Sequence, residues 1–323
     1  IDLTVGEPDF PTPEFIKDLA IEGLEKGLTK YTPSSGLKIF RDSIAAFYAE
    51  QFGAKILPIE IAASCGGKQA LFNAACAILN PGDDVLIPKP FWVTFPEIVN
   101  FCSANSVFIE TEETNFVLTA EQVKNSITEK TKLLIINSPN NPTGAVIPAE
   151  EMRKIVEACA EKNVYVLTDE CYLFFAYEPA KVFTSAVLPE NLRKFVCVAG
   201  SFSKTYAMTG WRIGYTIANE EWTQAIVKLQ SHSATHPTSF VQYACAEAMR
   251  RREDSMSAVG AMLAEYRRRR DWPHLAGKRL RHDFPRGRNL LHPAIARDWS
   301  ADPQQDRDDQ RHRQRAKASD ERQ

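Results

Sequence analysis

The sequence predicts an α/β protein in which a mostly parallel sheet lies between layers of helices. Short apolar segments alternate with longer amphipathic segments from residue 2 to residue 272. The apolar segments are short enough to be strands that are covered on both faces. Hydrophobic residues make up 44% and charged residues 25% of the 323 residues, which is the composition of a globular chain. Alternation of this kind is typical of sheets whose strands are connected by helices.

The apolar segments and the amphipathic segments give separate expectations. The expected strands are residues 85–87, 133–136, 164–167, 195–198 and 211–217. The expected helices are residues 40–52, 68–79, 149–162 and 239–252. In the second of these helices, Leu71, Ala74, Ala75 and Ile78 recur at the three-and-four spacing of one helical face. The Pro-Gly-Asp sequence at 81–83 then ends the helix.

The last part of the chain has a different composition. From Pro273 to Gln323 there are twelve basic and eight acidic residues, a net charge of +4, whereas the first 272 residues carry −6. The same segment holds four of the six His and contains no Val, Tyr or Cys. Residues 302–323 are almost wholly polar and cannot bury an apolar face.

Charge, hydropathy and cysteine usage exclude several classes of function. The net charge of −2 argues against binding nucleic acid or an anionic membrane through the overall field. We expect no transmembrane helix and no signal peptide, because no long apolar run and no basic leader is present. The seven Cys are widely spaced and form no C-x-x-C pair, so we expect reduced thiols in a cytoplasmic protein and no metal site.

One segment carries the most specific chemical signal. Residues 201–215 read SFSKTYAMTGWRIGY and directly follow an expected strand. In open α/β sheets, ligands bind beyond the carboxyl ends of the strands, which is where Lys204 is expected. Hydroxyl groups at Ser201 and Ser203, together with Arg212, can hold a phosphate beside this lysine. A lysine next to a phosphate pocket suits a Schiff base with an aldehyde cofactor.

This segment resembles the cofactor-lysine segment of the class I aminotransferases, which are fold-type I enzymes dependent on pyridoxal 5′-phosphate. The resemblance covers about residues 1–272 and is nearest to the bacterial aspartate aminotransferases of the thermophile and rhizobial type. Further segments agree in order and spacing. They are SCGGKQA at 64–70, PKPFW at 88–92, NSPNNPTG at 137–144 and TDECY at 168–172.

The resemblance implies a role for each of several residues. Lys204 would hold the cofactor and act as the general base, Asp169 would pair with the pyridine nitrogen, and Trp92 would stack on the ring. Asn141 and Tyr172 would bind the phenolic oxygen, and Gly6 would contact the substrate carboxylate, with Trp92 and Asn141 also near the substrate. The phosphate-binding residues would be Gly67, Lys68, Ser201, Ser203, Arg212 and, from a partner subunit, Tyr31. The side chain of Lys68 is expected to face outward.

The resemblance also implies an organisation and partners. Residues 1–35 would belong to the small domain and dimer arm, residues 36–260 to the large cofactor-binding domain, and residues 261–323 to the start of the C-terminal small domain. We expect a homodimer with shared active sites that acts on an amino acid and a 2-oxo acid, with aspartate and 2-oxoglutarate favoured. The family's front residues and its C-terminal carboxylate-binding Arg are not found, so the small domain is expected to be incomplete.

Alternatives remain open for the tail and for the activity. From about Pro273 the sequence is either frameshifted or a genuine divergent tail that binds an acidic partner; translation of the other reading frames separates these. For the activity, a C–S lyase, an aminocyclopropane-forming synthase or a prephenate or aromatic aminotransferase would use the same cofactor residues. An inactive cofactor-binding remnant is a further alternative. An effector domain of a transcription regulator is disfavoured, because no winged-helix segment precedes these motifs.

Overall fold

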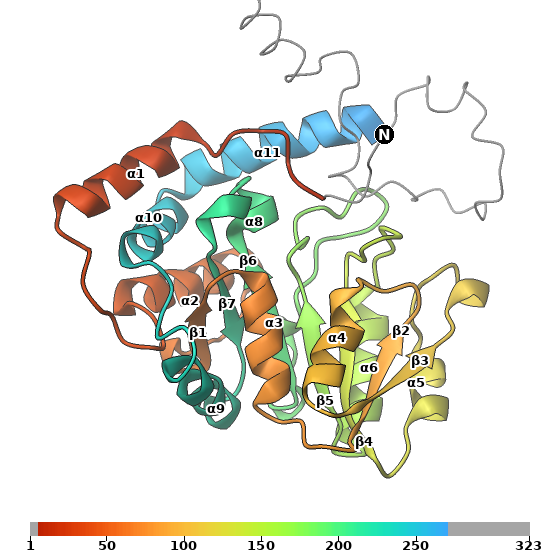
Figure 1. Cartoon of the computed structure of the whole chain (residues 1–323). Coiled ribbons are helices and arrows are strands. Elements are labelled where there is room, and N and C mark those ends of the chain that lie inside the picture. The colour runs from red at the N-terminus through yellow and green to blue at the C-terminus, as the bar shows by residue number, and fades with distance from the viewer. Residues whose placement is uncertain (1–5, 271–323) are drawn as a thin grey trace, which may run out of the picture.

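The structure is a computed structural model that describes residues 6–270. Its centre is a seven-stranded sheet with the order β1-β7-β6-β5-β4-β2-β3 (Figure 1). β7 is antiparallel to β1 and to β6, and the other neighbouring pairs are parallel. The prediction of a mostly parallel mixed sheet is therefore confirmed. The strands are β1 (Ile61–Ser64), β2 (Asp84–Pro88), β3 (Asn105–Ile109), β4 (Thr131–Asn137), β5 (Tyr165–Asp169), β6 (Val196–Ser201) and β7 (Gly214–Ile217).

Helices connect the strands and cover both faces of the sheet. Those in the described residues are α1 (Glu14–Glu25), α2 (Lys38–Phe52), α3 (Gly67–Cys76), α4 (Thr94–Phe101), α5 (Ala120–Ser126), α6 (Ala149–Ala160), α7 (Glu190–Arg193), α8 (Phe202–Thr205), α9 (Glu220–Ser231), α10 (Ser239–Arg250) and α11 (Arg252–Arg270). The four expected helices are present, each within about three residues of its predicted bounds.

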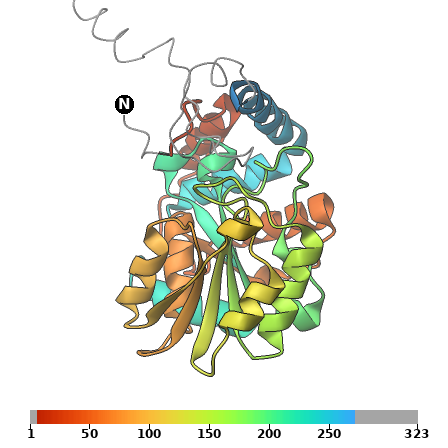
Figure 2. The same ribbon diagram turned by 90° about the vertical axis from the view of Figure 1, so that its right-hand side faces the viewer.

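The core is divided by the sheet into two layers because successive side chains of a strand point to opposite faces. In β4, Leu133 and Ile135 pack against α3, α4 and α9, whereas Leu134 and Ile136 face the layer that contains α2, α6 and α10. Figure 2 shows the sheet edge-on between these layers. Both faces are covered, which is why the strands read as continuous apolar runs rather than as alternating patterns.

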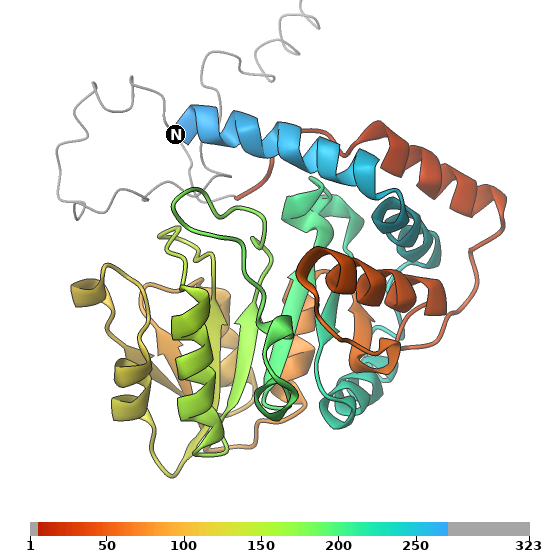
Figure 3. The same cartoon turned by 180° about the vertical axis from the view of Figure 1, so that it is seen from behind.

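The last helix lies along one end of this two-layer body, and its Val259 belongs to the core layer that contains α2, α6 and α10. α11 runs along the side of the molecule at which β5 and β6 end, and α1 and α10 lie beside it (Figures 1 and 3). Tyr266 of α11 is buried with Tyr172 and Phe175 in a small apolar cluster, against which Phe10 packs. α11 therefore connects the start of the described chain to the loop that follows β5.

One predicted strand was wrong at its start. Residues 211–217 were expected to be extended, but β7 begins at Gly214. Thr209–Trp211 forms a 3₁₀ turn, and Arg212 has a left-handed backbone with φ of 53°. This turn directs the Arg212 side chain toward the loop that precedes α3. The strands β1 and β3 were not predicted, since β1 is a four-residue segment and β3 is an edge strand with exposed positions.

Two further expectations concern the whole chain. Among the helices that the structure describes, none combines the length and apolar character needed to cross a membrane. All seven Cys are free, with Cys159, Cys197 and Cys245 buried and the other four half-buried. The predicted change in the sequence from about Pro273 lies outside the described residues, as do the domain assignments beyond residue 270.

Candidate active site

The functional residues meet at one edge of the sheet because neighbouring strands end there together. Asn137, the last residue of β4, is paired in register with Asp169, the last residue of β5. Ser201 at the end of β6 is paired with Gly214, which in turn is paired with Ser64 at the end of β1. Residues that are far apart in the sequence thus lie side by side at the carboxyl edge, as expected for a ligand site in an open α/β sheet.

A cavity of about 570 Å³ opens at this edge. It is lined by eleven of the twelve predicted site residues: Gly6, Gly67, Lys68, Trp92, Asn141, Asp169, Tyr172, Ser201, Ser203, Lys204 and Arg212. Tyr31 does not reach it. Residues that the sequence analysis did not select also line the cavity, among them Leu71, Phe91, Val93, Asn137, Cys171 and Thr209.

One end of the cavity is a cradle formed by glycines, hydroxyl groups and an arginine. α3 begins at Gly67, and Gly66 before it has φ of 87°, a conformation that L side chains rarely adopt. A Cβ on Gly66 would lie 2.4 Å from Nη2 of Arg212, and a Cβ on Gly67 would lie 3.1 Å from Cβ of Ser201. The start of α3 is therefore closely packed against Arg212 and Ser201, and backbone N–H groups at a helix start attract anions.

Arg212 and Ser201 are held by hydrogen bonds to the backbone. Nη1 of Arg212 donates to the carbonyl oxygen of Thr209 at 2.8 Å, and Nη2 donates to that of Cys65 at 3.4 Å. Oγ of Ser201 accepts from the N–H of Ser203 at 3.0 Å, which caps the short helix α8. This arrangement places a guanidinium and two hydroxyl groups at the start of α3.

Lys204 lies in α8, directly beyond the end of β6. Its Nζ donates a hydrogen bond to the carbonyl oxygen of Gly6. Burial lowers the pKa of Lys204, and the nearby Arg212 acts in the same direction, whereas Cys171, Glu7 and Asp169 oppose the shift. A larger fraction of this amine is therefore neutral, and hence nucleophilic, than for an exposed lysine.

Asp169 is a buried carboxylate that borders the same cavity. Its Oδ1 accepts from the N–H of Cys171 at 3.1 Å. Burial raises the pKa of Asp169 to about 6, although this hydrogen bond and the charge of Lys204 oppose the shift. A carboxylate in such a place gains stability from a cationic partner, which restores the interactions lost with water.

Asn137 links the two loops that follow β4 and β5. Its amide Nδ2 donates to the carbonyl oxygen of Asp169 at 3.0 Å, and its Oδ1 accepts from the N–H of Asn141 at 2.6 Å. Asn137 therefore sets the position of two predicted cofactor residues. The family resemblance implied a role for Asn141, which precedes Pro-Thr-Gly, and none for Asn137.

Trp92 also lines the large cavity. Nζ of Lys68 lies 4.9 Å from the centroid of the Trp92 ring, and Trp92 meets Phe95 edge-on at 5.6 Å. The expectation that Lys68 faces outward was wrong in part: its side chain is exposed, but it bends over Trp92 and lines the cavity. A cation over an aromatic face is a favourable contact, which accounts for this direction.

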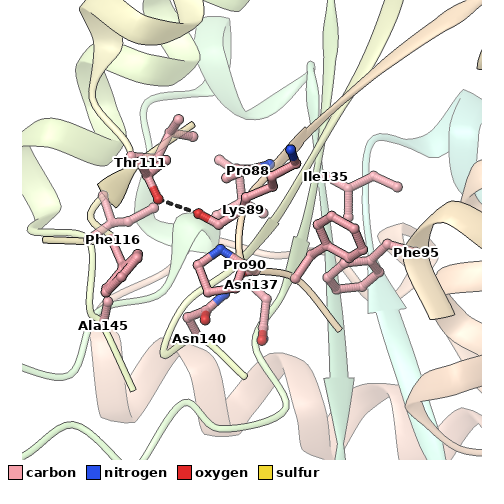
Figure 4. Close-up of a pocket in the computed structure, with 14 residues that line it drawn as sticks. Pro88, Lys89, Pro90, Phe95, Thr111, Phe116, Ile135, Asn137, Asn140 and Ala145 are labelled. Carbon is pink, nitrogen blue, oxygen red and sulfur yellow. Dashed lines mark hydrogen bonds between the residues drawn. The ribbon is translucent and has the colours of Figure 1, made fainter. Parts of the chain in front are cut away.

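The loop that carries Trp92 is supported from behind. Figure 4 shows a second cavity, of about 20 Å³, between residues 88–91 and the loop that follows β4. Oγ1 of Thr111 donates to the carbonyl oxygen of Lys89, and Nδ2 of Asn140 donates to that of Pro90 at 3.4 Å. This space holds about one water molecule and is too small for a substrate. The hydrogen bonds of Thr111 and Asn140 around this space hold the loop that carries Trp92 beside the loop that carries Asn141.

The first described residues close one side of the large cavity. Oγ1 of Thr12 donates to the carbonyl oxygen of Ala207 at 2.8 Å and accepts from Nε1 of Trp211 at 3.1 Å. Nη1 of Arg269 in α11 donates to both carboxylate oxygens of Asp9, at 2.9 and 2.8 Å. These contacts hold the segment so that the Gly6 carbonyl oxygen meets Lys204.

Tyr31 lies apart from these residues. Its side chain is 88% exposed and meets His236 edge-on at a centroid distance of 5.7 Å. The predicted phosphate contact of Tyr31 was assigned to a partner subunit, so its distance from the cavity of its own chain is compatible with that prediction.

Comparison with known proteins identifies the family. The sequence model for aminotransferase class I and II matches residues 1–274. A probable aspartate/prephenate aminotransferase from Aquifex aeolicus is 42% identical over 272 residues, which are 84% of this chain and 69% of that protein. The solved aspartate aminotransferase from Thermus thermophilus with maleate has a TM-score of 0.80 and 40% identity, and the likeness covers 83% of this chain and 70% of that one.

A third relative matches a longer part of the chain. The aspartate aminotransferase of Pyrococcus abyssi is 40% identical over 299 residues, 91% of this chain and 76% of that protein, so the match continues past Trp272. The frameshift hypothesis for the residues after Trp272 stays a prediction. The match of the family model to most of the chain and the likeness to solved aminotransferases agree with the cavity at the carboxyl edge of the sheet. This chain belongs to the class I and II aminotransferases and has their α/β fold of type I.

Proposed function

We propose that this chain binds pyridoxal 5′-phosphate and transfers the amino group between aspartate and 2-oxoglutarate. The observation that carries this proposal is the convergence of three features on one cavity. These are the buried amine of Lys204, the buried carboxylate of Asp169 and the anion-binding cradle at the start of α3. Relatives named aspartate aminotransferase or aspartate/prephenate aminotransferase support the choice of aspartate.

The residues of the cavity fit the proposed cofactor chemically. The phosphate would be held by the N–H groups at Gly67 and Lys68, by Ser201 and Ser203, and by Arg212. The close approach of Gly66 to Arg212 leaves no room for a Cβ at residue 66, so the Arg212 guanidinium packs directly against the backbone before α3. Asp169 would hold the proton on the pyridine nitrogen, which compensates a carboxylate whose pKa burial raises to about 6.

Asn141, Tyr172 and Trp92 would orient the cofactor ring. The hydroxyl of Tyr172 and the amide of Asn141 would donate to its phenolic oxygen, and the Trp92 ring would lie against its face. When bound, pyridoxal 5′-phosphate supplies an electron sink for charge that develops at the substrate α-carbon. Lys204, whose pKa is lowered by burial, would accept the proton from that α-carbon as a general base.

We propose that the functional unit is a homodimer in a cytoplasmic setting. Tyr31 is too exposed to serve its own cavity, and a phenol that reaches a partner's phosphate accounts for its surface position. The seven free thiols favour a reducing compartment. Analytical ultracentrifugation tests the dimer, and Tyr31→Phe is expected to weaken cofactor binding without a change in oligomeric state.

A second candidate is transfer to or from aromatic or prephenate-type substrates. It is favoured by the aromatic-amino-acid aminotransferase 2 of Thermococcus litoralis, which is 38% identical over 91% of this chain. The cations that line the cavity in the described residues are Lys68, Lys204 and Arg212. Rates with aspartate, phenylalanine and tyrosine, each with 2-oxoglutarate and prephenate, compare the two candidates.

One experiment tests the central proposal. The chain is mixed with pyridoxal 5′-phosphate, and its visible absorbance is recorded before and after aspartate is added. Borohydride treatment followed by peptide mass analysis is expected to locate the cofactor on Lys204, and Lys204→Ala should show no attachment. Attachment without a change on addition of any amino acid would favour a cofactor-binding remnant. With an amino acid that carries a thiol leaving group on its β-carbon, release of pyruvate and ammonia instead of amino transfer would favour a C–S lyase.

A further inference from the structure

Two cysteines at the far end of α3 lie close enough to react with each other. Sγ of Cys76, in the last residue of α3, is 3.4 Å from Sγ of Cys102, which caps the end of α4. Both side chains are half-buried. These residues are 26 positions apart in the sequence, and their approach results from the packing of α3 against α4.

The surroundings allow the two sulfurs to approach further. A disulfide requires about 2.05 Å between sulfurs, so the sulfurs have to approach by about 1.4 Å. Both cysteines are at helix ends, where the backbone adjusts more easily than inside a helix, and Ser103 after Cys102 already has a left-handed φ of 55°. Phe72, one turn before Cys76, packs against Phe101, the residue before Cys102, with ring centroids 4.7 Å apart, and this contact holds the two helices together.

We propose that Cys76 and Cys102 form a reversible disulfide when the chain meets hydrogen peroxide, and that this pair is a redox modification site. The thiolate of one cysteine attacks a peroxide oxygen, the O–O bond breaks, and hydroxide leaves and takes up a proton from the solvent, so that a sulfenic acid and water are produced. The second thiol attacks the sulfenic sulfur, the S–S bond forms and a second water leaves. Two thiols are thereby oxidised and one peroxide is reduced, and a thiol reductant restores the pair.

The two sulfurs have different roles in this sequence. Burial raises the pKa of Cys76 to about 12 and also raises that of Cys102, but the Cys76 S–H stabilises the Cys102 thiolate and opposes the second shift. Cys102 is therefore the first nucleophile and Cys76 the resolving thiol. Few thiolates are present near neutral pH, so the reaction is slow there and quickens about tenfold for each pH unit while the thiol predominates.

The position of the pair gives the disulfide a structural consequence. α3 begins at the glycine cradle, and α4 begins two residues after Trp92. A bond between their ends would close residues 76–102 into a loop and restrict the unfolded chain. We expect a melting temperature that is higher by about 5 °C or more in the oxidised chain. This inference does not depend on the proposed reaction, because neither thiol lines the cavity.

The test uses the full chain and hydrogen peroxide at about pH 8.5, where thiolates begin to form. Oxidised protein is alkylated and digested without reductant. Trypsin does not separate the two cysteines, because the single basic residue between them is Lys89 and Pro90 follows it. A Glu-specific protease cuts after Glu97 and does separate them, so a pair of peptides joined through Cys76 and Cys102 identifies the bond.

Variants make the result decisive. Cys76→Ser and Cys102→Ser should each abolish the joined peptides and the rise in melting temperature, whereas Cys65→Ser, at another half-buried cysteine, should leave both unchanged. Sulfenic acid trapped by dimedone should appear at Cys102 in Cys76→Ser. The proposal is overturned if the wild-type chain keeps both thiols free to alkylation after peroxide treatment, or if the joined peptides contain other cysteines.

Discussion

Two adjacent carboxylates show how the two sides of the sheet differ. Asp169 and Glu170 are both 5% exposed, and burial raises the pKa of Asp169 to about 6 and that of Glu170 to about 7. Asp169 borders the large cavity with Lys204. Glu170 instead accepts from the N–H of Ser185 at 2.8 Å and from the hydroxyl of Thr168 at 3.2 Å.

The surroundings of Glu170 are closed. The charge of Glu170 acts on two buried phenols, Tyr48 and Tyr215, whose hydroxyl oxygens are 3.0 Å apart. Both belong to the apolar core on the face of the sheet opposite α3 and α4. The two carboxyl groups are equally buried, and burial raises the pKa of both, but their surroundings differ. A ligand in the cavity can compensate the buried charge of Asp169, whereas Glu170 has only fixed protein groups around it.

Activity should separate the two residues most strongly. In the proposed function Asp169 would keep the cofactor nitrogen protonated, so we expect Asp169→Asn to lower kcat/KM for aspartate and 2-oxoglutarate by about a hundredfold or more. Glu170→Gln keeps the size of the side chain and one acceptor oxygen, and it should change kcat/KM by no more than about threefold. Steady-state kinetics, with circular dichroism as a control for folding, measures both. An equal fall in kcat/KM in both variants would contradict the distinction between Asp169 and Glu170.

The pH dependence of stability should distinguish them next. The folded chain binds the Glu170 proton more tightly than the unfolded chain, because its pKa rises from 4.5 to about 7. This contribution to stability is fully present below about pH 4.5 and is lost as pH rises to about 7. For Asp169 the corresponding window runs from 3.8 to about 6.

Replacing either carboxyl group by an amide should remove the loss of stability with rising pH in the pH window of that group. Glu170→Gln should flatten the stability curve between about pH 4.5 and 7 and stabilise the cofactor-free chain above pH 7 by about 3 kcal/mol. Asp169→Asn should flatten the stability curve at lower pH, between about 3.8 and 6. Added cofactor should reduce the difference in stability between wild type and Asp169→Asn, but not that between wild type and Glu170→Gln. Urea unfolding from about pH 3.5 to 8 covers both windows and measures these curves. A cofactor effect of the same size at Glu170 would remove the distinction.

The smallest expected effect extends the comparison from carboxylates to glycines. Gly66 and Gly82 both have φ of 87°, but a Cβ on Gly66 would press on Arg212, whereas one on Gly82 would meet no atom within 4 Å. Gly66→Ala and Gly82→Ala should each lose about 1 kcal/mol of stability, because alanine is strained in this conformation. Only Gly66→Ala should also weaken cofactor binding, by about tenfold, since it displaces the guanidinium.

Binding titrations and thermal unfolding measure this pair. Gly82 lies in an exposed turn before β2 and serves as the matched control for the backbone strain. If Gly82→Ala weakened cofactor binding as much as Gly66→Ala, the loss would be a general effect of instability. The cradle would then not depend on the close approach of α3 to Arg212.

Much of this arrangement could be predicted from local patterns. The runs at β2, β4, β5 and β6 consist of neighbouring apolar residues, and that pattern holds wherever both faces are covered. The segment around Lys204 was recognisable because polar residues directly follow such a run, whereas the roles of Asp169 and Asn141 were predicted from the family resemblance. β1 and β3 were not predicted. β1 has only four residues and β3 is a partly exposed edge strand, so neither has a distinctive sequence pattern.

Other features depend on contacts between distant segments. Arg212 turns into the site because a 3₁₀ turn and a left-handed residue interrupt what reads as a continuous strand. The part of Asn137 in positioning Asp169 depends on the register of β4 against β5. The bend of Lys68 over Trp92 depends on the placement of α3 beside the loop before α4.

The sequence by itself determined the fold class and predicted a cofactor role for Lys204, because apolar periodicity and short motifs are local properties of the chain. Only the tertiary structure decided which of two neighbouring carboxylates faces the cavity and which two of seven cysteines meet. Both outcomes follow from strand register and helix packing, which bring together residues whose separation in the sequence carries no information about their distance in space.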